Sequence, residues 1–485
     1  MINIPRSKNN KYFLIKVSGD NFHQLMTKKF IDTMEYKFGK KNIKIISLDV
    51  SCLQENMFQN PYRFLISITK LIFRHVQDIY FFNIKKEKSY FYFDPFVLSL
   101  KDLKEIIKLL KSKNINNDYS YLGIHLGDLI NDSLQRYCWN DWNLFKWLSK
   151  GFLTTFTFII LKKSIRIANK LKSENILYLA ASTSYSHNGL PFRVMSKKSN
   201  FTCYSSMSVN HTWLEFSNYS RSPYINYIKI GAQLQSGYLF NLKQAEEIGR
   251  KGLLKRISGK NDSTLPYMKT SSFNGRTSGE KFDFNNASIL YLHDLVDSSH
   301  HYPGFIFSNM IDYINFTLEI LIKNRRKFFI KLHPNESTGS KAIRNKIFDK
   351  IKIPDNTIIP SYFSNHEILS SKIKNVLSAH GNIIIEAGFY GHFSIGATKG
   401  SPASSFKNLL KIPKNKGEYE LLLLKNFNNQ EKDIIVFESK LANFLLCHAN
   451  IYMNDVDLSQ TRKLYQDSIN NRVFKTTGYL NLNFI

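Results

Sequence analysis

Cysteine is scarce in this chain, and its few copies form no pattern. Only four cysteines occur among 485 residues, and no two of them form a Cys-x-x-Cys pair. Structural zinc sites and disulfide frameworks need cysteines that are closely spaced or paired. Both are therefore excluded as the organising feature of the fold, and we expect a reducing, cytoplasmic location.

Long apolar runs are also missing. The longest largely apolar stretch covers residues 151–161 and is bounded by Lys150 and Lys162. A helix needs about 20 apolar residues to span a bilayer. The N-terminus lacks a charged segment followed by an apolar one, so we expect no signal peptide. The sequence predicts a soluble protein, or a peripheral one at the inner face of the cytoplasmic membrane.

Acidic residues are few compared with basic ones. There are 38 Asp and Glu against 67 Lys and Arg, which gives a formal net charge of +29. The lysines are dispersed, so we attribute most of the charge to compositional bias and solvated faces. Attraction to an anionic lipid surface or substrate is the second interpretation, and nucleic-acid binding is the third. We expect no nucleic-acid partner.

Metal-binding motifs are equally sparse. The only Asp-x-Asp joins Asp455 to Asp457 near the C-terminus, in a segment with a helical pattern. Metal-dependent sugar-nucleotide sites place such a motif at the end of a strand. We therefore expect no metal and no other cofactor.

The residues that are present alternate between short apolar runs and segments of helical period. Residues 258–279 interrupt this alternation with a stretch rich in Ser, Gly, Asn and Thr, which is typical of an exposed connection. Strands separated by helices predict parallel sheets with right-handed crossovers. The expected strands are 11–17, 44–50, 90–93, 121–126, 175–181, 287–293, 327–333 and 375–378, and the expected helices are 21–38, 99–113, 139–172, 309–323 and 437–465.

The strongest functional signal follows the strand at 327–333. This apolar run ends in Lys331, His333 and Pro334. Ligands of doubly wound sheets bind beyond the carboxyl ends of strands, where a His can donate to a phosphate and a Lys can add charge. The alternative is a His-Pro pair that merely ends a strand.

A second signal follows the strand at 375–378. A small turn of His380, Gly381 and Asn382 leads into a helix that carries Glu386. Free N–H groups at a helix N-terminus attract phosphate, and a carboxylate one turn later can accept from ribose hydroxyls. The alternative is an ordinary strand-to-helix turn with a capping Asn.

The two segments together resemble the donor half of bacterial capsule polysaccharide synthesis proteins, a group that includes capsular Kdo transferases. The resemblance maps the His-Pro pair, the later small turn and the Glu onto His333, Pro334, His380, Gly381, Asn382 and Glu386. Residues 291–300, 123–136 and 187–193 resemble further elements of that group. The resemblance implies an α/β fold of GT-B type, with two Rossmann-like domains facing a cleft.

The N-terminal half offers acidic and basic candidates. An inverting transfer needs a base to take the proton of the acceptor hydroxyl, and Asp128 and Asp132 are the acidic candidates. The alternative for Asp128 is a helix cap. Arg136, His187 and Arg193 are candidates for holding the acceptor, with turn formation and packing as their alternatives.

These observations lead to one expected organisation and function. We expect an acceptor-side Rossmann-like domain at 1–282, a donor-binding domain at 283–435 and C-terminal helices at 436–485 that pack back across the cleft. The expected activity is transfer of a sugar from a nucleotide sugar to a surface polysaccharide or glycolipid acceptor, with possible peripheral contact to an anionic membrane. The alternatives are a CDP-glycerol-type glycerophosphotransferase and a basic nucleic-acid-binding protein.

Overall fold

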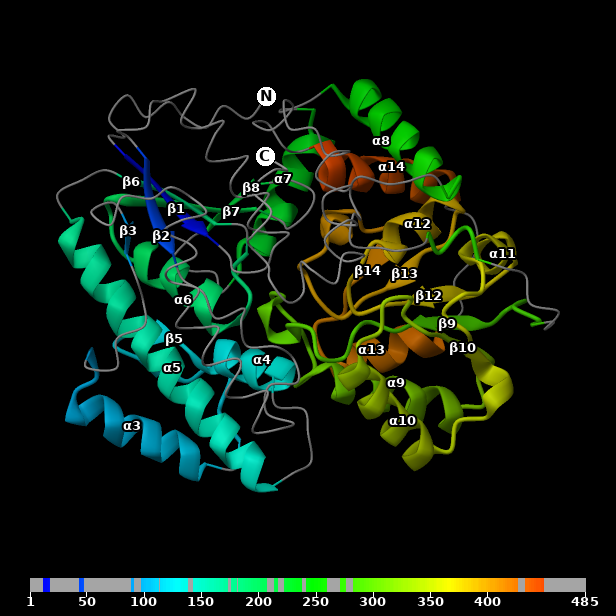
Figure 1. The fold of residues 1–485 in the computed structure, drawn as a ribbon. Coiled ribbons are helices and arrows are strands. Elements are labelled where there is room, and N and C mark those ends of the chain that lie inside the picture. Colours follow the sequence, from blue (N-terminus) through cyan, green and yellow to red (C-terminus); the bar gives the residue numbers. More distant parts are fainter. Residues whose placement is uncertain are drawn as a thin grey trace, which may run out of the picture. The chain divides into compact units, whose positions relative to one another are not determined.

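The computed structural model of the chain describes residues 12–17, 43–47, 89–90, 97–112, 114–137, 143–172, 176–180, 182–206, 213–216, 222–237, 241–259, 271–275, 282–425 and 432–448. The described residues divide into two compact units (Figure 1). The first unit ends at Pro223, and the second begins at Tyr224. The expected helix at 21–38 lies outside the described residues.

The first unit contains a six-stranded sheet in the order β3-β2-β1-β6-β7-β8. Numbered within the unit, this order is 3-2-1-4-5-6, which is the Rossmann arrangement. Neighbouring strands are parallel except for β7 and β8, which are antiparallel. The strands are β1 (Tyr12–Val17), β2 (Ile43–Ser47), β3 (Ser89–Tyr90), β6 (Ile176–Ala180), β7 (Phe201–Ser206) and β8 (Trp213–Phe216).

Within the described ranges, the same unit has the helices α3 (Leu100–Lys111), α4 (Gly127–Tyr137), α5 (Asn143–Lys170) and α6 (Tyr185–Met195). Helix α3 begins with a capping box, in which Ser99 accepts from the Asp102 N–H and Asp102 accepts from the Ser99 N–H. Helices α4, α5 and α6 bury their apolar residues in one shared core. For α3, the cap and the apolar period explain why the segment is helical.

The single strand expected at 121–126 is wrong. The structure has a short antiparallel hairpin there, formed by β4 (Ser120–Tyr121) and β5 (Ile124–His125). Leu122 and Gly123 connect the strands with φ angles of 52° and 71°. Two consecutive positive φ angles are typical of a type I′ turn, which closes a two-residue hairpin. The Leu at the first turn position concealed this turn in the sequence.

The second unit repeats the strand order of the first. Its six strands are parallel and lie in the order β11-β10-β9-β12-β13-β14, again 3-2-1-4-5-6 within the unit. The strands are β9 (Ser288–Tyr291), β10 (Phe328–Lys331), β11 (Ile358–Ile359), β12 (Asn375–Leu377), β13 (Ser394–Ile395) and β14 (Leu410–Lys411). The α/β fold with two Rossmann-like halves is therefore confirmed by strand order.

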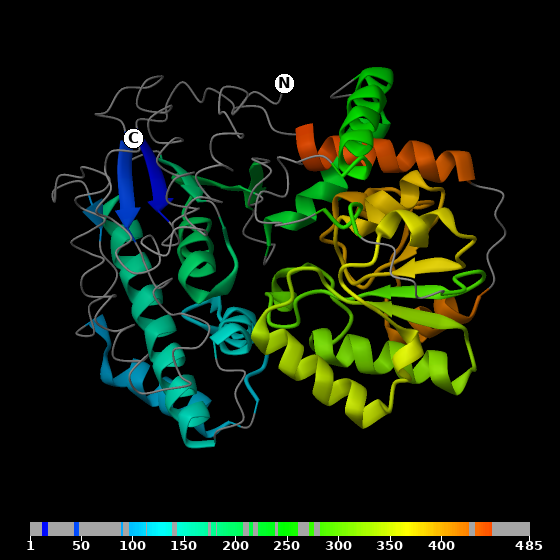
Figure 2. The same cartoon turned by 45° about the vertical axis from the view of Figure 1, so that its right-hand side comes forward.

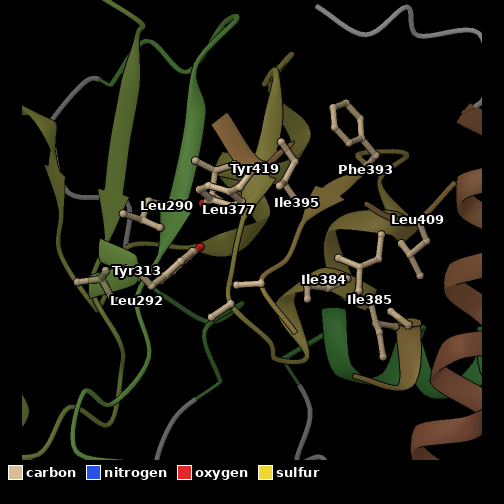
Figure 3. Close-up of a cluster of buried hydrophobic side chains, with 14 of the residues drawn as sticks. Leu290, Leu292, Tyr313, Leu377, Ile384, Ile385, Phe393, Ile395, Leu409 and Tyr419 are labelled. Atoms are coloured by element: carbon tan, nitrogen blue, oxygen red, sulfur yellow. The ribbon is translucent and has the colours of Figure 1, made fainter. Parts of the chain in front are cut away.

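Helices cover both faces of this second sheet (Figure 2). One face carries α9 (Met310–Lys323), α10 (Thr338–Ile351) and α13 (Lys416–Leu424), and the other carries α11 (Asn365–Ser370) and α12 (Ile383–Phe389). Sheet residues on the first face pack with α9 and α13 side chains such as Tyr313 and Tyr419 (Figure 3). The buried strands therefore read as continuous apolar runs, as parallel sheets require.

Three more helices belong to the second unit: α7 (Asn226–Gln235), α8 (Leu242–Ile257) and α14 (Lys432–His448). Lys440 on α14 donates to Glu246 on α8 at 2.8 Å, and Asn443 donates to the Gly249 carbonyl at 2.9 Å. A Cβ at Gly249 would lie 1.9 Å from the Lys440 carbonyl oxygen, so glycine permits this close contact.

The unit boundary at 223/224 differs from the one we expected at 282/283. Helices α7 and α8 precede the Ser- and Gly-rich stretch, yet they group with the second sheet because α8 packs against α14. The composition change at 258–279 therefore does not coincide with the unit boundary. Helix α14, expected to begin near 437, packs on α8 of its own unit.

Candidate functional site

The second sheet has a topological switch point between β9 and β12. Chain connections run in opposite directions on the two sides of this pair, so the loops after β9 and β12 diverge. Ligands of such sheets bind at the carboxyl ends of these strands. The residues just beyond the two strands are His293 and His380.

His293 and His380 stack on each other at this point. Their ring centroids are 4.1 Å apart with an interplanar angle of 28°. Tyr302, from the loop that follows β9, stacks on the other face of His380 at 3.8 Å and 21°. The next residue, Gly381, has a φ of 126°, and a Cβ there would come within 2.8 Å of His293 Cε1. The turn therefore requires glycine to keep the three rings together.

A hydroxyl group links His293 to the turn after β12. Ser378 Oγ donates to the His380 carbonyl at 2.7 Å and lies 3.0 Å from His293 Nε2. The His380 N–H also points to His293 Nε2, at 3.5 Å. The serine thus ties the ends of β9 and β12 into one arrangement.

His333 lies beyond the neighbouring strand β10 and has a comparable constraint. Its Nδ1 accepts from the Asn335 N–H at 3.2 Å, which leaves the proton of the neutral ring on Nε2. Within the described residues, Nε2 has no hydrogen-bond partner. Pro334 sits in the turn that closes with the Glu336 N–H donating to the His333 carbonyl. The turn orients an N–H donor that is available to a ligand.

Burial keeps all three imidazoles neutral. Desolvation lowers the pKa of His380 to about 3, and the charge of a protonated His333 adds to the effect. It lowers the pKa of His293 well below its ordinary value, and His380 and His333 contribute. Desolvation also lowers the pKa of His333, against the opposing influence of Asp294 and Asp297. The site therefore offers neutral N–H donors rather than fixed positive charges.

Side chains also hold the surrounding loops in place. Ser340 Oγ, near the start of α10, accepts from the Leu295 N–H at 2.9 Å, and Ser337 Oγ donates to Asp294 at the same distance. Thr398, which follows β13, donates to the Pro303 carbonyl at 2.9 Å. Loops after three strands are thus joined around the imidazoles, which favours a preorganised site.

Lys331 does not extend toward a ligand at the strand end. Its ammonium group donates to the carbonyls of Pro360 and Ser361 at 2.7 and 2.8 Å. The side chain is 2% exposed, and desolvation lowers its pKa to about 7. In this structure the hydrogen bonds of Lys331 therefore join β10 to the loop after β11.

Glu386 lies in α12 and forms an ion pair. Its Oε1 is 3.6 Å from Arg256 Nη1, which comes from the C-terminal turn of α8. Glu386 is 6% exposed and Arg256 is 3% exposed.

Asn382 begins α12 without a side-chain capping bond, so its alternative role as a side-chain cap is not seen.

The first unit brings two predicted residues together. The guanidinium group of Arg193 on α6 donates two hydrogen bonds of 2.6 Å to Asp128 on α4, one to each carboxylate oxygen. Arg193 also donates to the His125 carbonyl, and Asp128 accepts from the Leu129 N–H at 3.0 Å. Both side chains of the pair are buried. This bidentate pair joins two helices. Asp128 lies within the first turn of α4 and not at an N-cap position, so the capping alternative for Asp128 is not seen.

The other predicted residues of this unit are spread around that pair. Asp132 is fully buried one turn further along α4, and Arg136 lies in the last turn of the same helix. His187 is buried in α6 and stacks on Tyr185 with centroids 6.0 Å apart. Tyr185 has a φ of 63°, a strained value for a bulky residue. The structure thus places these residues on α4 and α6.

Sequence reasoning named His333, His380 and Gly381, which the structure places beyond the strand ends, but it did not name His293 or Tyr302. His293 follows a strand by two residues, as His333 does, so the same criterion could have identified it. Tyr302 gave no such signal, because a loop residue acquires its contact only through folding. The Arg256 contact to Glu386 was missed for the same reason.

Two further findings bear on the class of site. No group of three or more His, Cys, Asp or Glu side chains in the described ranges is arranged to hold a metal ion. Among the helices of those ranges, none combines the length and apolar character needed to cross a membrane.

Comparisons with known proteins cover family models, curated proteins and solved structures. No family model matches the chain, and no curated protein matches it. Among solved structures, similarity is found to a glycosyltransferase from Rickettsia africae ESF-5, with 10% identity over 96% of this chain and 100% of the other, and a TM-score of 0.28. UDP-GlcNAc 2-epimerase from Neisseria meningitidis, bound to UDP-GlcNAc, gives 12% identity over 94% and 99% with a TM-score of 0.30.

A ugt transferase from Siraitia grosvenorii in complex with UDP gives 13% identity over 95% of this chain and 100% of that one, with a TM-score of 0.26. These TM-scores are too low to establish a shared fold. The fold assignment therefore rests on the strand order of the two sheets, and the capsule group remains a prediction.

Proposed function

We propose that this protein is a glycosyltransferase that moves a sugar from a nucleotide-activated donor to a surface polysaccharide or lipid-linked acceptor. The donor nucleotide binds at the switch point of the second unit. The proposal includes action in the cytoplasm, at or near the inner face of the membrane, and transfer without a metal.

One observation carries the proposal. His293, His333 and His380 follow three strand ends of one Rossmann-type sheet, and the bond that His333 Nδ1 accepts leaves its N–H donor on Nε2. A neutral imidazole can donate to a phosphate oxygen of the donor without requiring a buried positive charge.

In this proposal each side chain has a separate task. His333 donates to the diphosphate or phosphate of the donor, and the stack of His293, His380 and Tyr302 forms one wall of the site. Glu386 remains the predicted partner of the ribose hydroxyls. Asp128 and Asp132 remain the predicted acidic candidates for the base, while Arg136, His187 and Arg193 remain predicted for the acceptor side.

The test measures nucleotide binding by calorimetry with CMP, CDP, UDP and their sugar conjugates. His333→Ala should weaken binding about ten- to hundredfold, since it removes a hydrogen bond to a charged group worth about 1.5–3 kcal/mol. The matched control is His366→Ala, because His366 is an exposed histidine of the same unit whose side chain bonds to the Tyr390 hydroxyl. Equal affinity of the wild type and H333A would contradict the proposed site.

Product analysis separates the proposal from its rivals. Transfer of glycerol phosphate would leave phosphodiester phosphorus in the polymer, whereas sugar transfer leaves none. Tight, salt-sensitive binding of generic DNA or RNA, without nucleotide selectivity, would favour the nucleic-acid alternative.

A further inference from the structure

Helix α3 leaves an apolar row exposed on its outer side. It buries Asp102, Ile106 and Leu109, yet Leu100, Leu103 and Ile107 are 80%, 42% and 51% exposed. Positions 100, 103 and 107 follow the i, i+3, i+7 spacing of one helical face. Three large aliphatic side chains thus lie next to one another on a face that α5 does not cover.

Helix α5 packs beside α3. Lys162 pairs with Asp102 at 3.2 Å, and Lys150 donates to the carbonyls of Leu110 and Ser112, so the two helices run side by side in opposite directions (Figure 1). A Cβ at Gly151 would lie 3.9 Å from a Leu110 methyl group.

Trp147 lies one turn before Gly151 and is 56% exposed. It is an exposed aromatic side chain on the helix that packs beside α3. Leu100, Leu103, Ile107 and Trp147 are called the apolar face below.

A row of lysines runs beside the apolar face. Lys101, Lys104, Lys108 and Lys111 recur every three or four residues on α3, and all four are exposed. The acidic residues of the helix do not cancel this row, since Asp102 is buried and paired with Lys162. Glu105 accepts from the Tyr119 hydroxyl and lies 3.9 Å from Lys108. The helix therefore presents an apolar row and a cationic row together.

We propose that the apolar face and the adjacent lysines dock this protein on the surface of an anionic lipid bilayer. The aliphatic side chains enter the boundary between headgroups and acyl chains, and the lysines contact the anionic headgroups. Trp147 suits this depth because its ring is apolar and its N–H is polar. The net charge of +29 adds a long-range attraction to the same surface.

This inference deepens the proposed function and rests on it only for its biological purpose, which is access to a lipid-linked acceptor. The apolar face lies in the first unit, whereas the donor site lies in the second. Vesicle binding is measured without a donor, so either proposal can fail while the other stands.

The experiment is flotation of the full chain with phosphatidylcholine vesicles that contain or lack phosphatidylglycerol. The wild type should float with the anionic vesicles and much less with the neutral ones, and added salt should weaken binding. Lys104→Glu with Lys108→Glu should weaken binding at least about thirtyfold. Leu103→Glu with Ile107→Glu should weaken it at least about tenfold, because charged groups cannot enter the acyl boundary.

Matched controls come from the second unit. Leu421→Glu replaces an aliphatic side chain that is 70% exposed on α13, and Lys323→Glu with Lys350→Glu replaces two exposed lysines of α9 and α10. These variants should float like the wild type. Circular dichroism checks that every variant remains folded, and the lysine pair tests the surface independently if the Glu substitutions at Leu103 and Ile107 unfold the protein.

Three outcomes would overturn the inference. The wild type could fail to float with anionic vesicles, or the α3 variants could float as well as their controls. The same variants could instead abolish self-association in sedimentation experiments without affecting vesicle binding, which would assign the apolar face to a contact between copies of the chain.

Discussion

Replacing Asp128 with Asn separates a structural role from a catalytic one. Both oxygens of Asp128 accept from Arg193 at 2.6 Å, and the two side chains are 1% and 6% exposed. Removing one partner of a buried ion pair leaves an uncompensated charge, which costs about 3–5 kcal/mol. For a unit of this size, that cost lowers the melting temperature by about 6–20 °C.

Tryptophan fluorescence is the assay of choice, because all four tryptophans lie before residue 224. It therefore reports unfolding of the first unit alone. D128N should unfold at a clearly lower temperature than the wild type. The double variant Asp128→Leu with Arg193→Met should recover part of the loss, since no unpaired charge then remains. A D128N protein that melts like the wild type but transfers no sugar would refute this reasoning and identify Asp128 as the base.

Three further predictions concern the second unit. Burial lowers the pKa of His380 to about 3 from the ordinary 6.5, so between these pH values the unfolded chain binds a proton that the folded chain does not. The free energy of unfolding should therefore fall as the pH drops from 6.5 toward 3. His380→Phe should reduce this pH dependence in urea unfolding. Glu386→Gln should destabilise the unit by leaving Arg256 buried, and Arg256→Met should restore stability, but nucleotide affinity should stay low in the double variant if Glu386 binds ribose. Both amide atoms of Asn375 are buried and lack partners within the described residues, so Asn375→Leu should leave the free energy of unfolding unchanged or increased, and a loss above about 1 kcal/mol would contradict this.

Local patterns in the sequence predicted the central strands well. The strand expected at 287–293 corresponds to β9, and the strand expected at 327–333 corresponds to β10, each trimmed at the carboxyl end. Both strands are buried on two faces, so each has a continuous run of apolar residues in the sequence, and this run indicated the strand. The residues trimmed from the strands are those that carry the site, including His293 and His333.

Side-chain direction was not predictable from the same letters. Lys331 and His333 both follow the apolar run of β10, yet Lys331 turns inward to carbonyls after β11. Its partners are about 30 residues away in sequence, and their position depends on the register between β10 and β11. The same limitation concealed the Arg256 contact of Glu386 and the stacking of Tyr302.

The two proposals concern separate steps of one reaction and separate units, which makes their combined effect predictable. His333 is proposed to bind the donor, and Leu103 and Ile107 are proposed to bind the membrane surface. The two sets of residues share no ligand. Effects of independent sites add in free energy, so their fold-losses multiply. With an acceptor embedded in anionic vesicles, H333A combined with Leu103→Glu and Ile107→Glu should lose transfer by the product of the separate losses. With a soluble acceptor, the combined variant should match H333A alone. A combined loss that exceeds H333A on the soluble acceptor would show that α3 contributes to catalysis itself.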